Sequence, residues 1–443
     1  MILKEWSLAH KTVIKLPLLI LKKQIKLTMK NFCLFLLCIV FFSCSTNKTE
    51  IYQWRGENRN GIFPEKNLLK EWPENGPKEL WYNDKIGDGY GSPTVTGNEI
   101  FITGAVDSTA TLFCLDLNGN ILWKAPFGKE WVVNYPGSRS APTVVDDLIY
   151  VGSGLNNLFC LKRSNGEVVW QKNFSDDYDA ILPRFGHSEA AVVDGDKVFW
   201  AVGGKEYNVV ALNRFTGEII WSNKGLGERS GYNPGNLIKL PSRNIFVTFS
   251  AYHLMGFDTE TGKMLWSHEQ TNTKPNERQP GLGDTHGNNV IFDKGYIYYA
   301  AGDGNGGVKL QLSENGSQIS EVWQNKEFDS YMGGIVKIDN QLYGSGTSEK
   351  EFKSINTETG AISDSLKLGW GAVIAADNML YYYSQNGKLS LVSYTTEGKL
   401  NQKSEFRIKR GSREHFSHPV IKNGVLYQRH GQVLMAFDIK AKD

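Results

Sequence analysis

The residues of this chain that could carry chemistry are polar and aromatic side chains that stand just before a series of short apolar runs. We take eight of them as candidate ligand-binding residues: Arg139, Arg184, His187, Glu189, Asp284, His286, Trp370 and His418. If the starts of those runs converge on one axis, these side chains would form the funnel of a small-ligand site. The alternative is a wet channel mouth whose polar groups only satisfy backbone atoms, and the sequence leaves both open.

The sequence gives little indication of a metal site or of a catalytic motif. His187, His286 and His418 belong to the third, fifth and eighth of the repeats described below, so we expect them to lie too far apart to share an ion, and we predict no metal site. The glycine-rich run 302–307 has no helix after it and indicates a turn rather than a phosphate loop. Serine, histidine and aspartate do not occur at the spacing of a nucleophilic motif. We therefore predict no catalytic residue.

A six-residue motif organises the elements that must position these side chains. Thr216-Gly217-Glu218-Ile219-Ile220-Trp221 recurs at 118–123, 165–170 and 261–266, each time with a glycine four residues before the tryptophan. The pattern predicts a hairpin turn, in which the glycine accepts positive φ, and a strand whose tryptophan fills a gap between stacked sheets. Trp170 and Trp221 are accordingly expected to be largely buried.

The spacing of the tryptophans predicts the architecture. Trp81, Trp123, Trp170, Trp221, Trp266 and Trp323 are separated by 42, 47, 51, 45 and 57 residues, a period typical of propeller blades. Two degenerate copies follow, and a last copy at 418–438 lacks its outer strand, whereas the strand at 79–83 lacks a blade. We predict an all-β fold, an eight-bladed β-propeller of four-stranded antiparallel blades at 78–443. Pairing the N-terminal strand with the C-terminal blade would close the ring.

The first 43 residues are predicted to be a lipoprotein signal peptide, of which residues 1–28 represent an over-extended start. Four lysines precede the apolar run Phe32 to Phe42, and Ser43-Cys44 then leads into a polar stretch. Cys44 is the predicted lipidation site, although Phe41 stands where such signals usually have leucine. An ordinary signal peptide or a single anchor helix is the alternative. Residues 44–77, rich in turn signals, are predicted to form a tether and an irregular cap.

The net charge argues against a nucleic-acid partner, and the positions of the cysteines indicate a structural role. Residues 1–43 carry seven Lys and one Glu, so without them the net charge changes from +2 to −4. No basic stripe remains, and we predict no nucleic-acid partner. Cys114 and Cys160 occupy equivalent positions in successive repeats and are expected to be buried and reduced.

The repeat, from 92–95 (SPTV) to 119–123 (GNILW), resembles the PQQ-binding-like β-propeller repeat over about residues 51–440. That repeat occurs in quinoprotein alcohol dehydrogenases and in BamB-type outer-membrane assembly lipoproteins. The resemblance implies the propeller fold but not one function. This chain departs from the dehydrogenases because it has neither adjacent cysteines nor a Cys-x-x-Cys-His segment.

Two function hypotheses follow. The first is a non-catalytic, monomeric envelope lipoprotein whose propeller is a scaffold for a protein partner and needs no cofactor. Cys44 would tether it to the outer membrane, on the periplasmic or the surface face. The second is a PQQ-dependent oxidoreductase or a small-ligand sensor that uses the central funnel.

Overall fold

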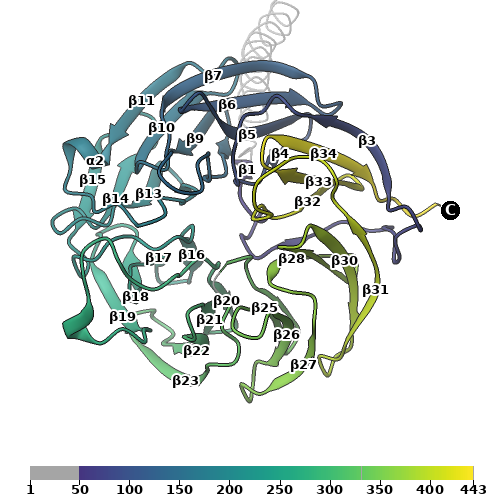
Figure 1. Cartoon of the computed structure of the whole chain (residues 1–443). Helices are drawn as coiled ribbons and strands as arrows, with labels where there is room; N and C mark the ends of the chain where they lie inside the picture. Colours follow the sequence, from purple (N-terminus) through teal and green to yellow (C-terminus); the bar gives the residue numbers. More distant parts are fainter. Residues whose placement is uncertain (1–48, 331, 443) are drawn as a thin grey trace, which may run out of the picture. The chain divides into compact units, whose positions relative to one another are not determined.

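Eight antiparallel β-sheets surround a common axis, each with its first strand near the axis and its last strand at the periphery (Figure 1). The computed structural model describes residues 49–330 and 332–442. The predicted signal peptide and Cys44 lie outside the described residues, and so does Tyr331. Residues Glu50–Asp443 form one unit. The all-β, eight-bladed propeller predicted from the sequence is confirmed.

Each blade is a four-stranded meander, and two of the blades gain a fifth, N-terminal strand. The blades are, in order, β4 (Thr94–Val95), β5 (Glu99–Val106), β6 (Thr109–Asp116) and β7 (Ile121–Lys129); β8 (Thr143–Val145), β9 (Leu148–Gly152), β10 (Asn157–Lys162) and β11 (Val168–Asn173); β12 (Val192–Asp194), β13 (Lys197–Ala201), β14 (Val209–Asn213) and β15 (Ile219–Asn223); β16 (Asn236–Lys239), β17 (Asn244–Phe249), β18 (His253–Asp258) and β19 (Met264–Glu269); β20 (Ile291–Asp293), β21 (Tyr296–Ala301), β22 (Gly306–Leu312) and β23 (Ile319–Asn325); β24 (Val336–Ile338), β25 (Gln341–Gly346), β26 (Glu351–Asn356) and β27 (Ile362–Leu366); β28 (Gly371–Ala376), β29 (Met379–Ser384), β30 (Lys388–Tyr394) and β31 (Leu400–Arg407); and β32 (Val420–Lys422), β33 (Val425–His430), β34 (Val433–Asp438) and β3 (Lys78–Asn83). The described helices are short: α2 (Phe174–Asp177) and the 3₁₀ turn η1 (Pro275–Glu277).

Strand β3 closes the ring. It pairs antiparallel with β34, with Trp81 opposite Ala436 and Lys78 opposite Asp438. Since β34 would otherwise be an open edge, the N-terminal strand gives the eighth blade the outer strand that the last sequence repeat lacks. The predicted closure is confirmed.

The repeated motif connects neighbouring blades. Gly217 adopts φ of +73°, as predicted for the turn, and a Cβ at this position would come within 2.7 Å of the Trp170 ring. The Trp170 indole donates a hydrogen bond to the Arg214 carbonyl, 2.9 Å away, in the turn of the next blade. Trp221 repeats this arrangement one blade further on, against Gly262. Each tryptophan therefore packs on the glycine turn of the following repeat.

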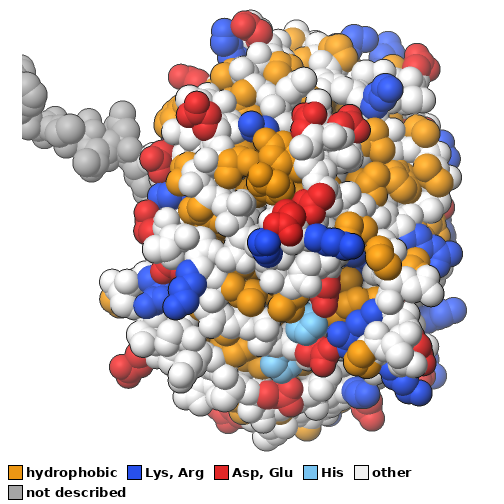
Figure 2. All heavy atoms as spheres, turned by 90° about the vertical axis from the view of Figure 1, so that its left-hand side faces the viewer, with side chains coloured by type: hydrophobic (Ala, Val, Ile, Leu, Met, Phe, Trp, Pro, Cys, Tyr) orange, Lys and Arg blue, Asp and Glu red, His pale blue; other side chains and the backbone are white. Residues whose placement is uncertain are grey.

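Burial of these tryptophans is uneven. Trp170 is 8% exposed and Trp266 is 7% exposed, as expected for residues between sheets. Trp221, expected to be largely buried, is partly buried on the corresponding peripheral strand β15, where it packs against a core cluster of blades 3 and 4 that includes Phe199 and Phe257. The outer wall in Figure 2 shows acidic, basic and apolar side chains intermingled, without a continuous basic surface in this view.

Both expected thiols are free and buried. Cys114 lies in β6 and Cys160 in β10, each with its side chain inside a blade core. Burial raises the pKa of each thiol to about 12, so both are protonated at neutral pH. No described helix has the length and apolar character that crossing a membrane requires.

The segment before β3 fills one end of the central channel. Strand β1 (Ile51–Tyr52) pairs antiparallel with the first strand of blade 2, with Ile51 opposite Val145 at the end next to the β8–β9 turn. Strand β2 (Ile62–Phe63) pairs parallel with β28, with Ile62 beside Ala375 near the β28–β29 turn. The chain therefore enters and leaves the channel through the face that carries these turns. We call residues 50–63 the plug.

Two buried arginines fix the plug to opposite sides of the channel. Arg55, 2% exposed, donates to the carbonyls of Ile335 and Val373 at 2.8 and 2.9 Å and lies 2.9 Å from the ring nitrogen Nδ1 of His418. Those partners belong to blades 6, 7 and 8. Arg59, also 2% exposed, donates to the carbonyl of Ala191 and, at 3.3 Å, to that of Gly235, in blades 3 and 4.

Replacing Trp170 with alanine should lower the free energy of unfolding by about 3–5 kcal/mol, because the indole is buried and its hydrogen bond ties two blades together. Reversible chemical denaturation measures the change. The control is Val322→Ala, at a side chain that is 45% exposed on the outer wall, with an expected effect within about 0.5 kcal/mol. Equal losses for the two variants would contradict the interlocking role of the tryptophan.

Replacing Arg55 with alanine should lower stability by about 3 kcal/mol or more, because hydrogen bonds to charged donors are strong and buried carbonyls would lose their partners. The matched control is Arg407→Ala, whose exposed guanidinium also donates to a backbone carbonyl, that of Asn386. We expect the control to change stability by less than about 0.5 kcal/mol. A similar effect of both substitutions would show that the plug is not held by Arg55.

Candidate functional site

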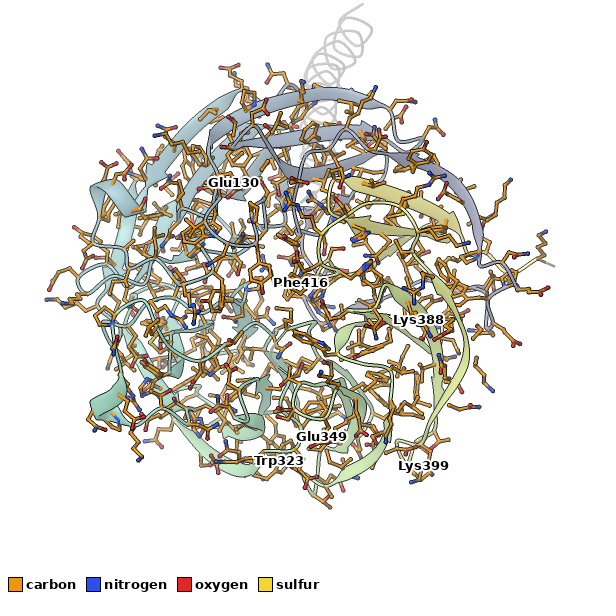
Figure 3. The ribbon with its side chains drawn as sticks, in the orientation of Figure 1. Glu130, Trp323, Glu349, Lys388, Lys399 and Phe416 are labelled. Atoms are coloured by element: carbon orange, nitrogen blue, oxygen red, sulfur yellow. The ribbon has the colours of Figure 1, made fainter. Side chains whose placement is uncertain are left out.

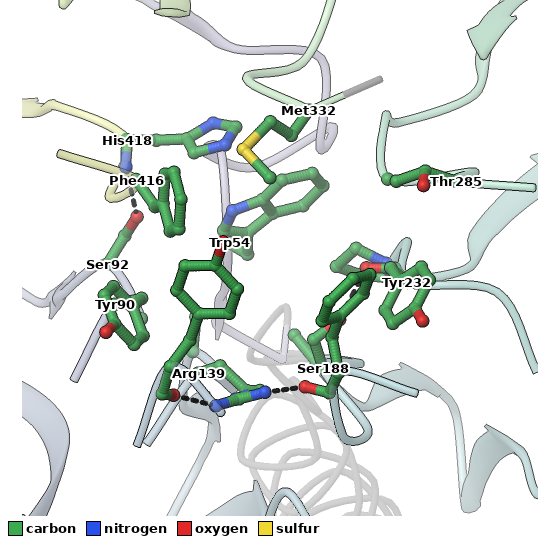
Figure 4. Close-up of a pocket in the computed structure, with 17 residues that line it drawn as sticks. Trp54, Tyr90, Ser92, Arg139, Ser188, Tyr232, Thr285, Met332, Phe416 and His418 are labelled. Atoms are coloured by element: carbon green, nitrogen blue, oxygen red, sulfur yellow. Dashed lines mark hydrogen bonds between the residues drawn. The ribbon is translucent and has the colours of Figure 1, made fainter. Parts of the chain in front are cut away.

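A pocket of about 230 Å³ opens at the end of the channel opposite the turns where the plug enters (Figure 4). Its walls are the segments that lead into the innermost strands of the blades. The lining residues are Trp54, Tyr90, Gly91, Ser92, Tyr135, Arg139, Ala141, Phe185, Ser188, Ala190, Tyr232, Pro234, Thr285, Gly287, Met332, Phe416 and His418.

Five aromatic rings form a continuous arc around this pocket. Tyr90 contacts Phe416 with ring centroids 5.4 Å apart, and Phe416 contacts Tyr135 at 5.8 Å. Tyr135 contacts Phe185 at 5.9 Å, and Phe185 contacts Tyr232 at 6.0 Å. Figure 3 shows Phe416 near the centre of the ring of blades. Tilted and edge-on pairs of this kind are favourable, so the arc holds a defined shape.

Trp54 of the plug provides the floor. Its side chain is 7% exposed and packs against Ala141 and Ala190, at the starts of the innermost strands of two neighbouring blades. The His418 ring lies beside it, with centroids 5.2 Å apart (Figure 4). Because the plug fills the channel below Trp54, the pocket is a blind recess.

His418 is held in its neutral form. Arg55 can only donate, so Nδ1 of His418 must accept the hydrogen bond between them. Burial, and secondarily the charge of Arg55, keep the pKa of His418 well below its ordinary value near 6.5. This side chain is therefore unsuited to take up a proton from a ligand.

Positive charge lies behind the aromatic arc. The Arg139 guanidinium lies in the wall and donates to the carbonyls of Phe185, Tyr135 and Gly137. Burial lowers its pKa. Among residues 49–330 and 332–442 it forms no ion pair with a carboxylate.

Two further arginines flank the rings. The guanidinium carbon of Arg184 lies 5.4 Å from the centre of the Phe185 ring, and that of Arg229 lies 4.9 Å from the centre of the Tyr232 ring. Cations at these distances are attracted by the ring faces.

None of the described lining residues is acidic, and the carboxylates near the pocket accept hydrogen bonds from other protein groups. Glu130 is buried and accepts hydrogen bonds from the Ser138 hydroxyl at 2.6 Å and from the backbone amides of Trp131 and Gly154. Burial raises the pKa of Glu130, and its hydrogen bonds and the nearby charge of Arg139 oppose that shift. At the rim, Glu414 accepts a hydrogen bond from the hydroxyl of Tyr90.

Of the eight candidates named from the sequence, Arg139 and His418 line the pocket. His187, Glu189, Asp284 and His286 do not, although their chain neighbours Ser188, Ala190, Thr285 and Gly287 do. Successive side chains of an extended segment point to opposite sides, so the choice of residues was displaced by one position.

The four displaced residues instead stabilise the blades. His187 lies 3.1 Å from the Ala201 carbonyl, and Glu189 accepts hydrogen bonds from the Ala201 amide and the Thr248 hydroxyl. Asp284 accepts a hydrogen bond from Thr273 at 3.2 Å. The His286 ring stacks on Phe249 with an interplanar angle of 7°.

Arg184 and Trp370 also lie outside the lining, and a ligand role for any of the eight candidates stays a prediction. Sequence reasoning missed Trp54 and most of the aromatic arc. A usable signal was an aromatic residue two positions before the residue that faces the channel, as in Tyr90 and Ser92, or Tyr232 and Pro234. In residues 49–330 and 332–442, no three His, Cys, Asp or Glu side chains are grouped so as to hold a metal ion.

Buried titratable groups predict a stability maximum near pH 6.5. Burial lowers the pKa of His187 to about 4 and of His286 to about 3, whereas it raises the pKa of Glu189 to about 8. Below pH 6.5 the unfolded histidines bind protons that the folded ones exclude, so stability is lost as pH falls toward 4. The effect of Glu189 on stability has the opposite sign, because its folded-state pKa is raised. Its stabilising contribution is present at low pH and is lost as pH rises toward 8.

Denaturation by urea at pH 5, 6.5 and 8 measures this profile. His187→Gln should reduce the acid-side slope by about one proton, or about 1.4 kcal/mol per pH unit. The exposed-residue variant Lys399→Gln is the control and should keep the original slope. An unchanged slope in His187→Gln would contradict the assignment of a neutral buried histidine.

Comparison with known proteins places the fold in context. The chain is 30% identical to a quinoprotein ethanol dehydrogenase of Pseudomonas aeruginosa over 148 residues, a match that covers 33% of this chain and only 20% of the dehydrogenase. It is 22% identical to the outer membrane protein assembly factor BamB of Yersinia pestis over 343 residues, or 71% of this chain and 77% of that protein.

Solved structures agree on the architecture. The crystal structure of BamB from Moraxella catarrhalis superposes with a TM-score of 0.59 at 13% identity, covering 82% of this chain and 100% of that one. The quinohemoprotein alcohol dehydrogenase of Comamonas testosteroni superposes with a TM-score of 0.62 at 12% identity, covering 87% and 80%. At such identities the likeness shows the fold alone.

A family model adds to these pairwise similarities. The family model described as outer membrane protein assembly factor BamB matches residues 65–231 and 108–366, so the two matches together cover most of the propeller. On this evidence the chain belongs to the BamB family of β-propeller proteins.

Proposed function

We propose that this protein is a non-catalytic envelope lipoprotein whose propeller is a scaffold for a protein partner in outer-membrane assembly. The observation that carries the proposal is the difference between the two faces of the propeller. One face carries the pocket and long connections with exposed apolar tips, and the other carries the short turns between first and second strands.

The long connections suit a protein partner. The loop 130–142 exposes Val132, Val133 and Tyr135 by 51%, 76% and 43%, and the loop 270–290 exposes Leu282 by 43%. Exposed apolar side chains grouped within one loop, as at Val132, Val133 and Tyr135, are a feature of interaction sites. On the opposite face, two-residue turns such as 146–147 and 377–378 connect the strands. Phe215 is an apolar exception there, and it is covered on one side by Arg214, 4.2 Å from its ring centre.

The pocket chemistry favours binding over turnover. A quinone cofactor of the PQQ type is used with a bound cation, and Ca²⁺ takes about six to eight oxygen ligands, many of them carboxylates. No carboxylate is found among the described lining residues, and Nδ1 of His418 already accepts a hydrogen bond from Arg55. The side chains present therefore do not fit a calcium–quinone centre, and we derive no redox step from them.

The anchor sets the orientation in this proposal. Cys44 precedes Glu50 by six residues, a stretch that spans at most about 20 Å. The chain then enters the propeller on the turn face, since Ile51 pairs beside the β8–β9 turn. A lipid on Cys44 would hold the turn face toward the membrane and leave the pocket face free for a partner.

Site-specific photo-crosslinking in cells of the native host tests the proposal. A photoreactive residue at position 133, on the pocket face, should form a discrete adduct with one envelope protein. The matched control is position 196, where the exposed Asp196 lies in a short turn of the opposite face, and it should not form that adduct. Cys44→Ser should move the protein from the membrane to the soluble envelope fraction and weaken the adduct at position 133.

Three results would contradict the proposal: the same adduct at both positions, no adduct at either, or unchanged membrane partitioning of a processed Cys44→Ser protein. Loss of the chain should also reduce the amount of folded outer-membrane protein, and normal amounts would argue against a role in assembly.

A further inference from the structure

The pocket combines apolar walls with one cation, Arg139, that forms no ion pair among residues 49–330 and 332–442. Most of its lining is aromatic or aliphatic, and its remaining polar side chains are the hydroxyls of Ser92, Ser188 and Thr285, the buried ring of His418, and Arg139. From this combination we propose that the pocket binds a monoanionic ligand with one flat apolar body and one carboxylate. The proposal concerns the ligand alone and holds whether or not Cys44 is lipidated.

Arg139 provides the anion-binding group. The guanidinium donates only to backbone carbonyls, which carry no net charge: those of Phe185, Tyr135 and Gly137. A guanidinium has five N–H donors and prefers a carboxylate, which it binds with short charge-assisted hydrogen bonds. A partly buried charge that lacks a direct ion-pair partner is costly, because it has lost part of its hydration. An anion that binds Arg139 in the pocket would replace that lost interaction.

The rings select against a cation. Aromatic cages bind quaternary ammonium groups through the negative faces of their rings. Here Arg184 already lies over Phe185 at 5.4 Å and Arg229 over Tyr232 at 4.9 Å. Because protein cations already lie against these two rings, a cationic ligand would meet three arginines and no carboxylate in the described lining. The arc therefore offers apolar contact area rather than a site for positive charge.

The volume limits the apolar body. At about 230 Å³ the pocket is smaller than the roughly 300–1,000 Å³ of sites for drug-sized molecules. One aromatic ring with a short side arm fits this size. The Trp54 indole on the floor and the arc of Tyr90, Phe416, Tyr135, Phe185 and Tyr232 present ring faces and edges on which such a body can stack.

This ligand chemistry has two sources. One is a free aromatic carboxylic acid. The other is the C-terminal residue of a polypeptide, whose terminal carboxylate and aromatic side chain offer the same pair of groups. The apolar tips of the loop 130–142 beside the pocket would contact the preceding residues of such a polypeptide, at Val132 and Val133.

Isothermal titration of the full chain with a matched probe series tests the proposal. The probes are 3-phenylpropionate, its amide 3-phenylpropanamide, and the cation phenethyltrimethylammonium. A short peptide ending in phenylalanine, as the free acid and as the C-terminal amide, forms the second arm. We expect each carboxylate to bind about 10- to 100-fold more tightly than its amide, and the cation to bind least, because a hydrogen bond between charged groups is lost.

Arg139→Gln should remove this preference: carboxylate affinity should fall to that of the amide, while amide affinity stays within about twofold. The matched control is Arg407→Gln, an arginine that also donates to a backbone carbonyl but lies outside the pocket, and it should bind all probes like the original protein. If Arg139→Gln does not fold, the acid-versus-amide comparison in the original protein, together with Arg139→Lys, decides the question.

Binding by the free acid alone supports the small-molecule source, and binding by the peptide acid alone supports the polypeptide source. Equal affinity for acid and amide, tighter binding of the cation, or no binding by any probe would overturn the proposal.

Discussion

The inner edges of the blades are the constraint on which the rest of the structure depends. The first strand of every blade faces the channel with one side of its backbone unpaired, and such an edge attracts other chains unless it is covered. The plug covers two of these edges with strands β1 and β2 and reaches four more blades, 3, 4, 6 and 8, through the side chains of Arg55 and Arg59. Guanidinium groups suit this task because each donates several hydrogen bonds in diverging directions to separate carbonyls.

This solution also determines the site. Because the plug enters from the turn face and presents Trp54 to the opposite side, it closes the channel from one end and forms the floor of the pocket at the other. The same Arg55 that binds the carbonyls of blades 6 and 7 holds His418 neutral. A change in the plug would therefore be transmitted to the pocket floor, so the stability of the ring and the shape of the pocket depend on the same short segment.

Periodicity carried most of the fold prediction but could not resolve the site. The tryptophan spacing predicted eight blades and their closure, because each repeat must bury the same face against its neighbour. It could not predict which residues of the loops before the inner strands point into the channel. The candidates His187 and His286 were therefore each one residue away from Ser188 and Thr285, which line the pocket. Nor could it place Trp54, since the plug occurs once and has no repeat to reveal it. The motif also does not predict the degree of burial, since Trp170 is buried and Trp221 partly buried at equivalent positions.

Alternate side chains of these loops differ in role, because some point into the blades and others point into the channel. Side chains that point into the blades, such as Glu189 and His286, are polar and satisfy backbone or stack within the core. Those that face the channel are small or aromatic, which leaves room for a ligand and offers it apolar surface. A catalytic site needs titratable groups in contact with the ligand, and here most of them are turned away from it. The polar residues therefore hold the ring together, whereas the aromatic residues and Arg139 line the pocket for which we propose a ligand.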